Sequence, residues 1–256
     1  MNTSNGQQAH THGTRLAATV IALGLMAGVV ALMAGPGYRL GWWGLREGIK
    51  AISWSGMASA GLVVLSLLGA AIAYKMGLRP AFTRFLAGAA LSALTALPVA
   101  YFGYKANTLP HIHDVTTDTV HPPAFVAVLP LRKDAKNPAT YDPLVAPLQQ
   151  QAYPDIAPIA LPMDGTHAFV LTQQVAQAMG WEVVAVDATA LRMEATATTR
   201  LFGFKDDIVV RVTPADKGST VDIRSLSRVG GSDIGTNAAR IRTFRQRLLD
   251  AAAAKG

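Results

Sequence analysis

Charged side chains alternate along the strand-like segments of the C-terminal half. Successive side chains of a strand point to opposite faces, so one sheet face can carry Arg192, Glu194, Arg200, Asp207, Arg211, Asp222, Arg224 and Arg228. Such a face could form a pocket for an anionic ligand, because guanidinium groups bind carboxylate and phosphate. It could also be a cross-strand ion-pair network that orders the sheet. Five arginines against three acids nearly balance, which favours the network.

A second group of polar residues lies around residues 111–121. In an extended chain His111 and His113 project to the same side, as metal ligands would. Their spacing matches none of the usual zinc patterns, and Asp and Thr side chains of this segment suit hydrogen bonds to backbone groups. We therefore favour a docking strand and expect no cofactor. The weak metal candidates are His113, Asp114 and Asp118.

The turn at residues 230–235 (GGSDIG) leads into a helix, and a helix N-terminus can bind phosphate. Its spacing is neither a P-loop nor a dinucleotide fingerprint, so we interpret it as a strand end followed by a helix cap. Two of its neighbours still join the candidate ligand set. That set is Arg200, Asp207, Arg211, Asp222, Arg224, Arg228, Asp233 and Asn237.

Two further surfaces have open interpretations. Phe202 and Phe204 lie at a hairpin tip, where they would contact the bilayer or a partner, or fold back onto the domain. The last helix carries Arg240, Arg242, Arg245 and Arg247. A basic amphipathic helix can rest on a membrane, although a solvated face beside a buried stripe is the more ordinary interpretation.

The elements that position these residues form an α+β pattern. Residues 105–163 are rich in proline and are predicted to be extended, with one strand at 125–129. The core, residues 164–256, follows as a helix at 166–179, strands at 181–186, 191–198, 208–213 and 220–228, and a last helix from Ser232 or Asp233. The order is strand, helix, four antiparallel strands, helix. It predicts a two-layer domain with one sheet face on the helices and a more polar opposite face.

The N-terminal half is a membrane region in residues 16–104, after a tail at 1–15. Apolar runs at about 16–35, 51–73 and 85–104 each have the roughly 20 residues that a spanning helix needs. None contains Asp, Glu, Lys, Arg or His, and transport pathways usually require such groups. We therefore expect three transmembrane helices that serve as an anchor rather than a conduit.

Charge distribution argues against nucleic-acid binding. Of the formal charge of +7, seven cations and one acid (7 − 1 = +6) precede Lys105, beside the apolar runs. There they meet lipid headgroups and set topology, whereas a phosphate backbone needs a basic surface on the folded domain. Four cations flank each side of the predicted spans, so charge does not orient them. The absence of cysteine excludes disulfides and thiolate sites.

Three segments resemble a family of unknown function, DUF 1499. They are residues 112–118 (IHDVTTD) with Pro122, Pro123 and Phe125; residues 192–198 (RMEATAT), 202–207 (FGFKDD) and 209–212 (VVRV); and residues 221–230 (VDIRSLSRVG) with 232–241 (SDIGTNAARI). The resemblance covers about the last 145 residues and leaves out the three apolar runs. It implies an exported or lumenal domain, hence a multi-pass inner-membrane protein with a periplasmic domain. It implies no established reaction.

These observations favour a membrane-anchored envelope protein, with the bilayer as one partner. Its soluble domain is expected to bind a lipid, a small anion or an envelope protein without catalysis. One alternative is a membrane-tethered hydrolase or other enzyme that uses the Arg/Asp strand face with His113. A second is a structural assembly factor, in which the same charges only stabilise the fold.

Overall fold

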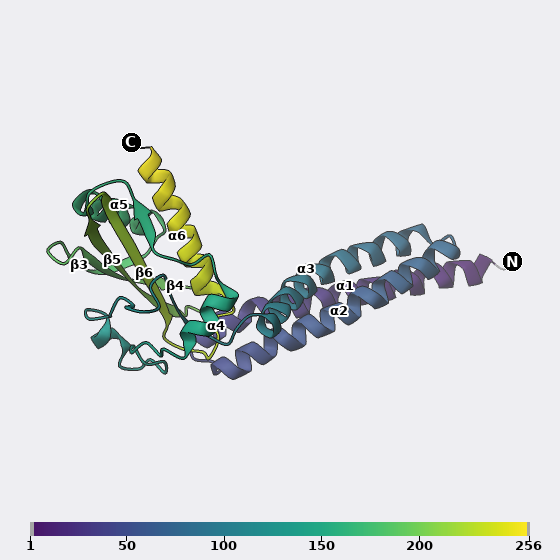
Figure 1. Cartoon of the computed structure of the whole chain (residues 1–256). Helices are drawn as coiled ribbons and strands as arrows, with labels where there is room; N and C mark the ends of the chain where they lie inside the picture. The colour runs from purple at the N-terminus through teal and green to yellow at the C-terminus, as the bar shows by residue number, and fades with distance from the viewer. Residues whose placement is uncertain (1–2, 255–256) are drawn as a thin grey trace. The chain divides into compact units, whose positions relative to one another are not determined.

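The computed structural model describes residues 3–254 and divides the chain between Tyr104 and Lys105 into two compact units. Within the described residues there are six α-helices, one short 3-10 helix and six strands (Figure 1). Each unit is considered by itself below.

The N-terminal unit consists of long helices. They are α1 (Thr3–Arg39), α2 (Leu45–Lys75) and α3 (Arg79–Thr108). Each is long and apolar enough to cross a membrane, which confirms the three predicted helices. The tail predicted at 1–15 is helical from Thr3 onward, because α1 already begins there. Extending an existing helix costs little compared with nucleating one, so the polar residues continue the apolar helix outward.

Small residues bring these helices close together. A Cβ atom added at Gly24 would lie 2.7 Å from the Ser92 hydroxyl oxygen, and one at Gly56 would lie 2.3 Å from a Val99 methyl carbon. Only glycine fits at such contacts, which is typical of helix packing inside membranes. Large apolar side chains instead cover the outer faces of the three helices, where Leu25 and Leu68 are more than half exposed.

The C-terminal unit is built on one antiparallel sheet with the order β1-β6-β5-β4-β3, in which β2 also pairs with β6. The strands are β1 (Asp114–Thr116), β2 (Ile159–Leu161), β3 (Glu182–Asp187), β4 (Arg192–Thr198), β5 (Lys205–Ala215) and β6 (Gly218–Ser227). The four antiparallel strands predicted from the alternating pattern are confirmed as β3 to β6.

Two helices cover one sheet face and enclose the core. They are α5 (Gly165–Ala178), which Asp164 caps through two backbone N–H groups, and α6 (Thr236–Ala253). Trp181 and Phe244 stack in this core with ring centroids 5.4 Å apart. The helices and the sheet are the two layers that the sequence predicted.

Residues 117–144, here called the covering segment, lie over the other sheet face. Phe125 and Val128 from this segment pack on Val209 and Leu226 of the sheet. The face is polar, as expected, but it is buried rather than open to solvent. The segment contains the 3-10 helix η1 (Leu129–Arg132), and the short helix α4 (Val145–Ala152) follows it.

The predicted strand at 125–129 is wrong, and so is the wholly extended conformation of residues 105–163. The backbone N–H groups of Val126, Ala127 and Val128 all bind the Glu194 carboxylate. Three consecutive N–H groups directed at one side chain cannot also pair in a ladder, where donors alternate in direction. α4 forms despite Pro147, because proline is tolerated in the first turn of a helix.

Candidate functional site

Arg224 of β6 is the most enclosed cation of the sheet face, with 2% of its surface exposed. Its Nε and Nη2 atoms donate to the two carboxylate oxygens of Asp114, at 2.9 and 2.7 Å, and Nη2 also donates to the Ala139 carbonyl. The guanidinium lies over the rings of Phe125 and Tyr141, 4.9 and 5.3 Å from their centroids. This buried arginine therefore joins β6 to β1 and to two parts of the covering segment, one at Phe125 and one at residues 139–141.

Tyr141 reflects the enclosure of this cluster. Burial, with a smaller contribution from the Asp114 carboxylate, raises the pKa of Tyr141 to about 12. The phenol therefore stays neutral at physiological pH, and its ring packs against the Arg224 guanidinium as an uncharged face.

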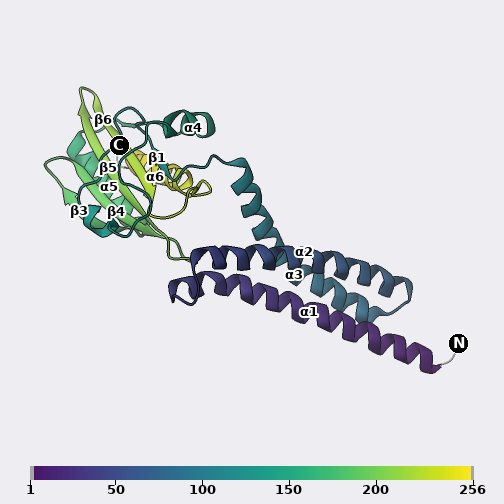
Figure 2. The ribbon, with the colours of Figure 1, turned by 90° about the horizontal axis from the view of Figure 1, so that it is seen from below.

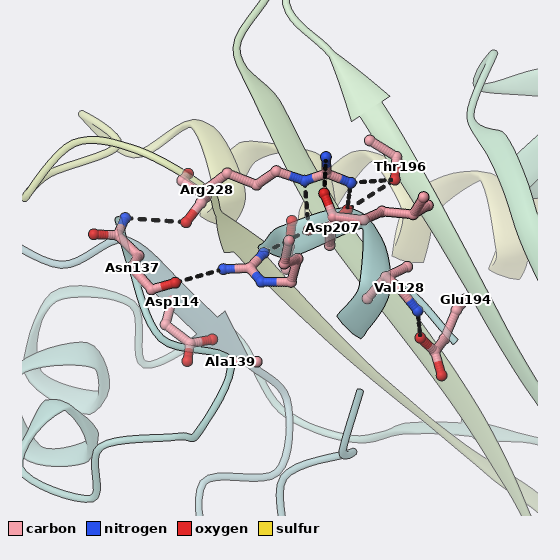
Figure 3. Close-up of polar contacts among 12 residues, drawn as sticks. Asp114, Val128, Asn137, Ala139, Glu194, Thr196, Asp207 and Arg228 are labelled. Atoms are coloured by element: carbon pink, nitrogen blue, oxygen red, sulfur yellow. Dashed lines mark hydrogen bonds and ion pairs between the residues drawn. The ribbon is translucent and has the colours of Figure 1, made fainter. Parts of the chain in front are cut away.

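Asp207 of β5 is fully buried and receives hydrogen bonds from three side chains (Figure 3). Arg228 donates through Nε and Nη2 at 2.9 and 2.8 Å, Thr196 donates at 2.8 Å, and Arg132 of η1 donates from the covering segment. Arg132 also donates to the Asn137 carbonyl at 2.9 Å. Burial alone raises the pKa of Asp207, but the bonds from Arg228, Thr196 and Arg132 outweigh it and hold that pKa below its usual value.

Glu194 of β4 fixes the middle of the covering segment. Its carboxylate accepts from the backbone N–H groups of Val126, Ala127 and Val128 at 2.9 to 3.0 Å, and from Arg192. Figure 3 shows the bond from Val128. The Glu194 side chain is 1% exposed. The carboxylate therefore supplies the hydrogen-bond acceptors for backbone N–H groups that have no partner in a strand ladder.

Arg211 joins the start of the covering segment to the sheet. Its Nη2 donates to Asp118 at 3.0 Å and to Asp222 at 2.9 Å, and Thr117 donates to Asp222. Burial raises the pKa of Asp118, whereas two backbone N–H groups and Arg211 lower it, and the result is a depressed pKa. The charges thus pair across strands and with the covering segment.

A smaller polar cluster lies on the helix side of the sheet. Asn237 of α6 donates from Nδ2 to the His113 carbonyl at 2.9 Å and accepts from Ser225 at 2.7 Å. Arg240 donates to Ser225 at 2.8 Å and to Asp206 at 2.5 Å. These contacts join β6 and β5 to the first turns of α6.

Asp233 closes the turn before α6. Its two carboxylate oxygens accept from the backbone N–H groups of Gly235, at 2.8 Å, and Asn237, at 2.6 Å. Burial is the largest influence on this group and raises its pKa. The carboxylate thus occupies the helix start that a bound phosphate would need.

The weak metal candidates do not converge. His113 has Nδ1 3.5 Å from the Gly231 carbonyl oxygen, whereas Asp114 pairs with Arg224 and Asp118 with Arg211. Within residues 3–254 no three His, Asp or Glu side chains form a group that could hold a metal ion.

A family model described as a protein of unknown function (DUF1499) matches residues 114–248, more than half of the chain. This chain belongs to the DUF1499 family. The match begins at Asp114, the partner of Arg224, and it includes the covering segment but none of the three long helices. No curated protein matches the chain.

Several residues that complete the buried ion pairs of the DUF1499 domain were not predicted. Arg132, Asn137 and Tyr141 lie in the covering segment, which has no periodic pattern, and only the folded chain brings them to Asp207 and Arg224. Composition is the one sequence feature that points to these residues. The segment has polar residues between prolines and no periodic pattern, so its backbone N–H and C=O groups need side-chain partners.

The two aromatic side chains of the β4–β5 turn stack on each other. Phe202 is 7% exposed and stacks on the half-buried Phe204, with centroids 4.9 Å apart. Arg200 is an exposed residue of the turn that follows β4. Neither position belongs to the buried ion pairs described above.

One basic groove opens on the outer side of α6, with a volume of about 300 Å³, lined by Arg242, Arg245, Gln246 and Leu249. Arg242 is held by two 2.6 Å hydrogen bonds to Asp155 and lies over the Tyr153 ring. Arg245 makes a longer contact of 3.4 Å to the Asp155 carbonyl. A fixed guanidinium beside a loosely held one is an arrangement that suits an anionic group.

Proposed function

We propose that this DUF1499 protein is a membrane-anchored envelope protein whose soluble domain binds a lipid, a small anion or a protein partner without catalysing a reaction on it. The observation that carries the proposal is the use of the strand-face charges. Arg211 pairs with Asp222 and with Asp118 of the covering segment, and Arg224 pairs with Asp114 of β1. These ion pairs hold the strands and the covering segment together, so the charges stabilise a scaffold on which a binding surface can lie.

Catalysis is the less favoured alternative. A general acid or base must lie within hydrogen-bond reach of the substrate, but Glu194 and Asp207 are buried and already accept several bonds each. A hydrolase that used this face with His113 would first have to release the covering segment. The same contacts also favour a structural contribution, because each of them stabilises the fold.

The α6 groove is the surface that best fits an anion. Arg242 and Arg245 provide guanidinium donors and Leu249 an apolar floor, as a phosphate or carboxylate attached to a lipid would require. Three helices suited to a membrane keep the domain close to such lipids. The inner membrane, with the domain in the periplasm, is the location that we propose, on the basis of the family resemblance.

The test uses the full chain in detergent micelles and measures its melting temperature with inorganic phosphate, citrate, phosphatidylglycerol or phosphatidylethanolamine. A ligand at a hundred times its Kd stabilises a fold by about 2.7 kcal/mol. We expect stabilisation by an anionic compound, and loss of it in Arg245→Gln. The matched control is Arg247→Gln on the same helix, because Arg247 donates to the Ala178 carbonyl and does not line the groove.

Two results would contradict the proposal. Equal loss of stabilisation in Arg245→Gln and Arg247→Gln would show that the α6 groove is not the binding site. Turnover of ester or phosphoester substrates that disappears in Asp207→Asn, while the variant remains folded, would favour the enzyme.

A further inference from the structure

One side of α4 is fastened to the sheet by an uncharged side chain. Gln149 is almost fully buried, and its amide oxygen accepts from the Thr116 backbone N–H at 2.9 Å. Its amide nitrogen donates to the Thr116 carbonyl at 2.7 Å. Gln149 therefore takes the place of another strand beside β1 and fixes which side of α4 faces outward.

The outward side of α4 is apolar. Leu144, at the start of the helix, is 79% exposed, and Leu148, one turn later, is 49% exposed. Residues four apart lie on one helix face, and α4 (VAPLQQQA) carries no charged residue. An uncharged helix with adjacent exposed leucines does not follow the usual rule for a water-facing surface.

The end of α4 lies where the chain leaves α3. Tyr153, directly after α4, has its hydroxyl 3.4 Å from the position of a Cβ atom added at Gly235. The same position is 2.9 Å from Leu109 and 3.9 Å from Lys105, at the end of α3. These contacts all belong to the C-terminal unit. Lys105 directly follows Tyr104 of α3, a helix long and apolar enough to cross a membrane, so within the C-terminal unit the end of α4 lies near the residue at which the chain leaves that candidate span.

We propose that α4 inserts Leu144 and Leu148 into the interfacial region of the bilayer that α3 crosses, so that the helix rests on the lipid surface. The occupant of this apolar face is lipid, because Tyr153 at the end of α4 lies near Lys105, the residue that follows the third candidate span, and a helix without charges loses little by leaving water. The inference is independent of the anion groove on α6. Figure 2 shows α4 as a separate helix at the edge of the sheet domain.

The absence of cysteine makes the test direct. Single cysteines replace Leu144, Leu148 or Val170 in the full chain, each is labelled with an environment-sensitive NBD fluorophore, and the protein is reconstituted into phosphatidylcholine vesicles with or without spin-labelled lipid. Val170 is the matched control, because it is an apolar, 45% exposed position on α5. That helix begins at Gly165 beside Pro214, near the β5–β6 turn.

We expect the emission of the probes at 144 and 148 to shift to the blue, and spin-labelled lipid to quench them several-fold more strongly than the probe at 170. Equal quenching at all three positions, or water-like emission at 144 and 148, would overturn the proposal. A separate measurement shows whether the variants at 144 and 148 are folded. In a chain whose Trp42, Trp43 and Trp54 are replaced by phenylalanine, the fluorescence of Trp181, stacked on Phe244 in the core, reports whether each labelled chain retains its domain.

Discussion

Arg224 joins β1 and the covering segment to β6 through several contacts of one side chain. It binds both oxygens of Asp114, a carbonyl of the covering segment and two aromatic rings. Its loss would leave the Asp114 carboxylate buried without its partner, and breaking a buried pair costs about 3–5 kcal/mol.

The corresponding prediction is that Arg224→Ala lowers the free energy of unfolding of the domain by about 3–5 kcal/mol. Denaturant titration in detergent measures the change, followed by the fluorescence of Trp181 in a chain whose Trp42, Trp43 and Trp54 are replaced by phenylalanine. Arg247→Ala is the control, because an exposed arginine usually changes stability by less than about 0.5 kcal/mol. Similar losses in the two variants would show that the buried cluster contributes little.

Asp207 predicts a loss of stability in acid. The donors around it hold its folded-state pKa below the ordinary value of 3.8. A depressed folded-state pKa stabilises the fold above the unfolded-state value, and this contribution is lost as pH falls toward the folded-state value. We expect the melting temperature to fall below about pH 4, and the fall to be shallower in Asp207→Asn, which is already destabilised at neutral pH. Parallel pH curves for the two proteins would contradict this assignment.

The local pattern of the sequence located both partners of the ion pairs within the sheet, such as Arg211 and Asp222, but only one partner of those made with the covering segment. Alternation with a period of two places Arg211, Asp222 and Arg224 on a common face, because strand geometry depends only on neighbours. The partners Arg132 and Tyr141 could not be predicted, since an aperiodic segment finds its place through tertiary contacts alone. The alternation thus identified a charged face but not its cover.

At the scale of elements, Glu194 holds the covering segment by its backbone. Replacing the carboxylate by an amide in Glu194→Gln leaves one oxygen acceptor where there were two, so at least one of the three N–H groups loses its acceptor, and it removes the charge beside Arg192. We predict faster tryptic cleavage after Lys133 and Lys136, measured by mass spectrometry of timed digests. Glu182→Gln provides the control, because Glu182 is exposed at the start of β3. Equal cleavage rates in both variants would indicate that the segment is held elsewhere.

Periodic elements were predictable and short ones were not. The helices α5 and α6 and the strands β3 to β6 each repeat an apolar pattern often enough to be recognised. β1 and β2 have only three residues each, so no period can be seen in them. The apolar residues near 125–129 resemble a strand, yet their N–H groups bind Glu194 because a carboxylate with several donors competes successfully with a ladder.

At the scale of the whole molecule, the number of membrane crossings decides which side each segment faces. Three crossings place the N-terminus opposite both the α1–α2 connection and the soluble domain. Single cysteines at Gln8, Leu40 and Ala254, all exposed in the structure, can therefore be treated with a membrane-impermeant maleimide on intact cells. We predict labelling at Leu40 and Ala254 but not at Gln8, as a periplasmic domain requires.

Permeabilised cells provide the control, because all three positions should then react. Labelling of Gln8 alone would place the soluble domain in the cytoplasm while leaving three crossings intact. Different labelling of Leu40 and Ala254 would have a larger consequence. It would mean that α2 and α3 do not both cross the bilayer, although each is long and apolar enough to do so. The lipid contact proposed for α4 would then lose its basis, since that contact depends on the chain leaving the membrane at the end of α3.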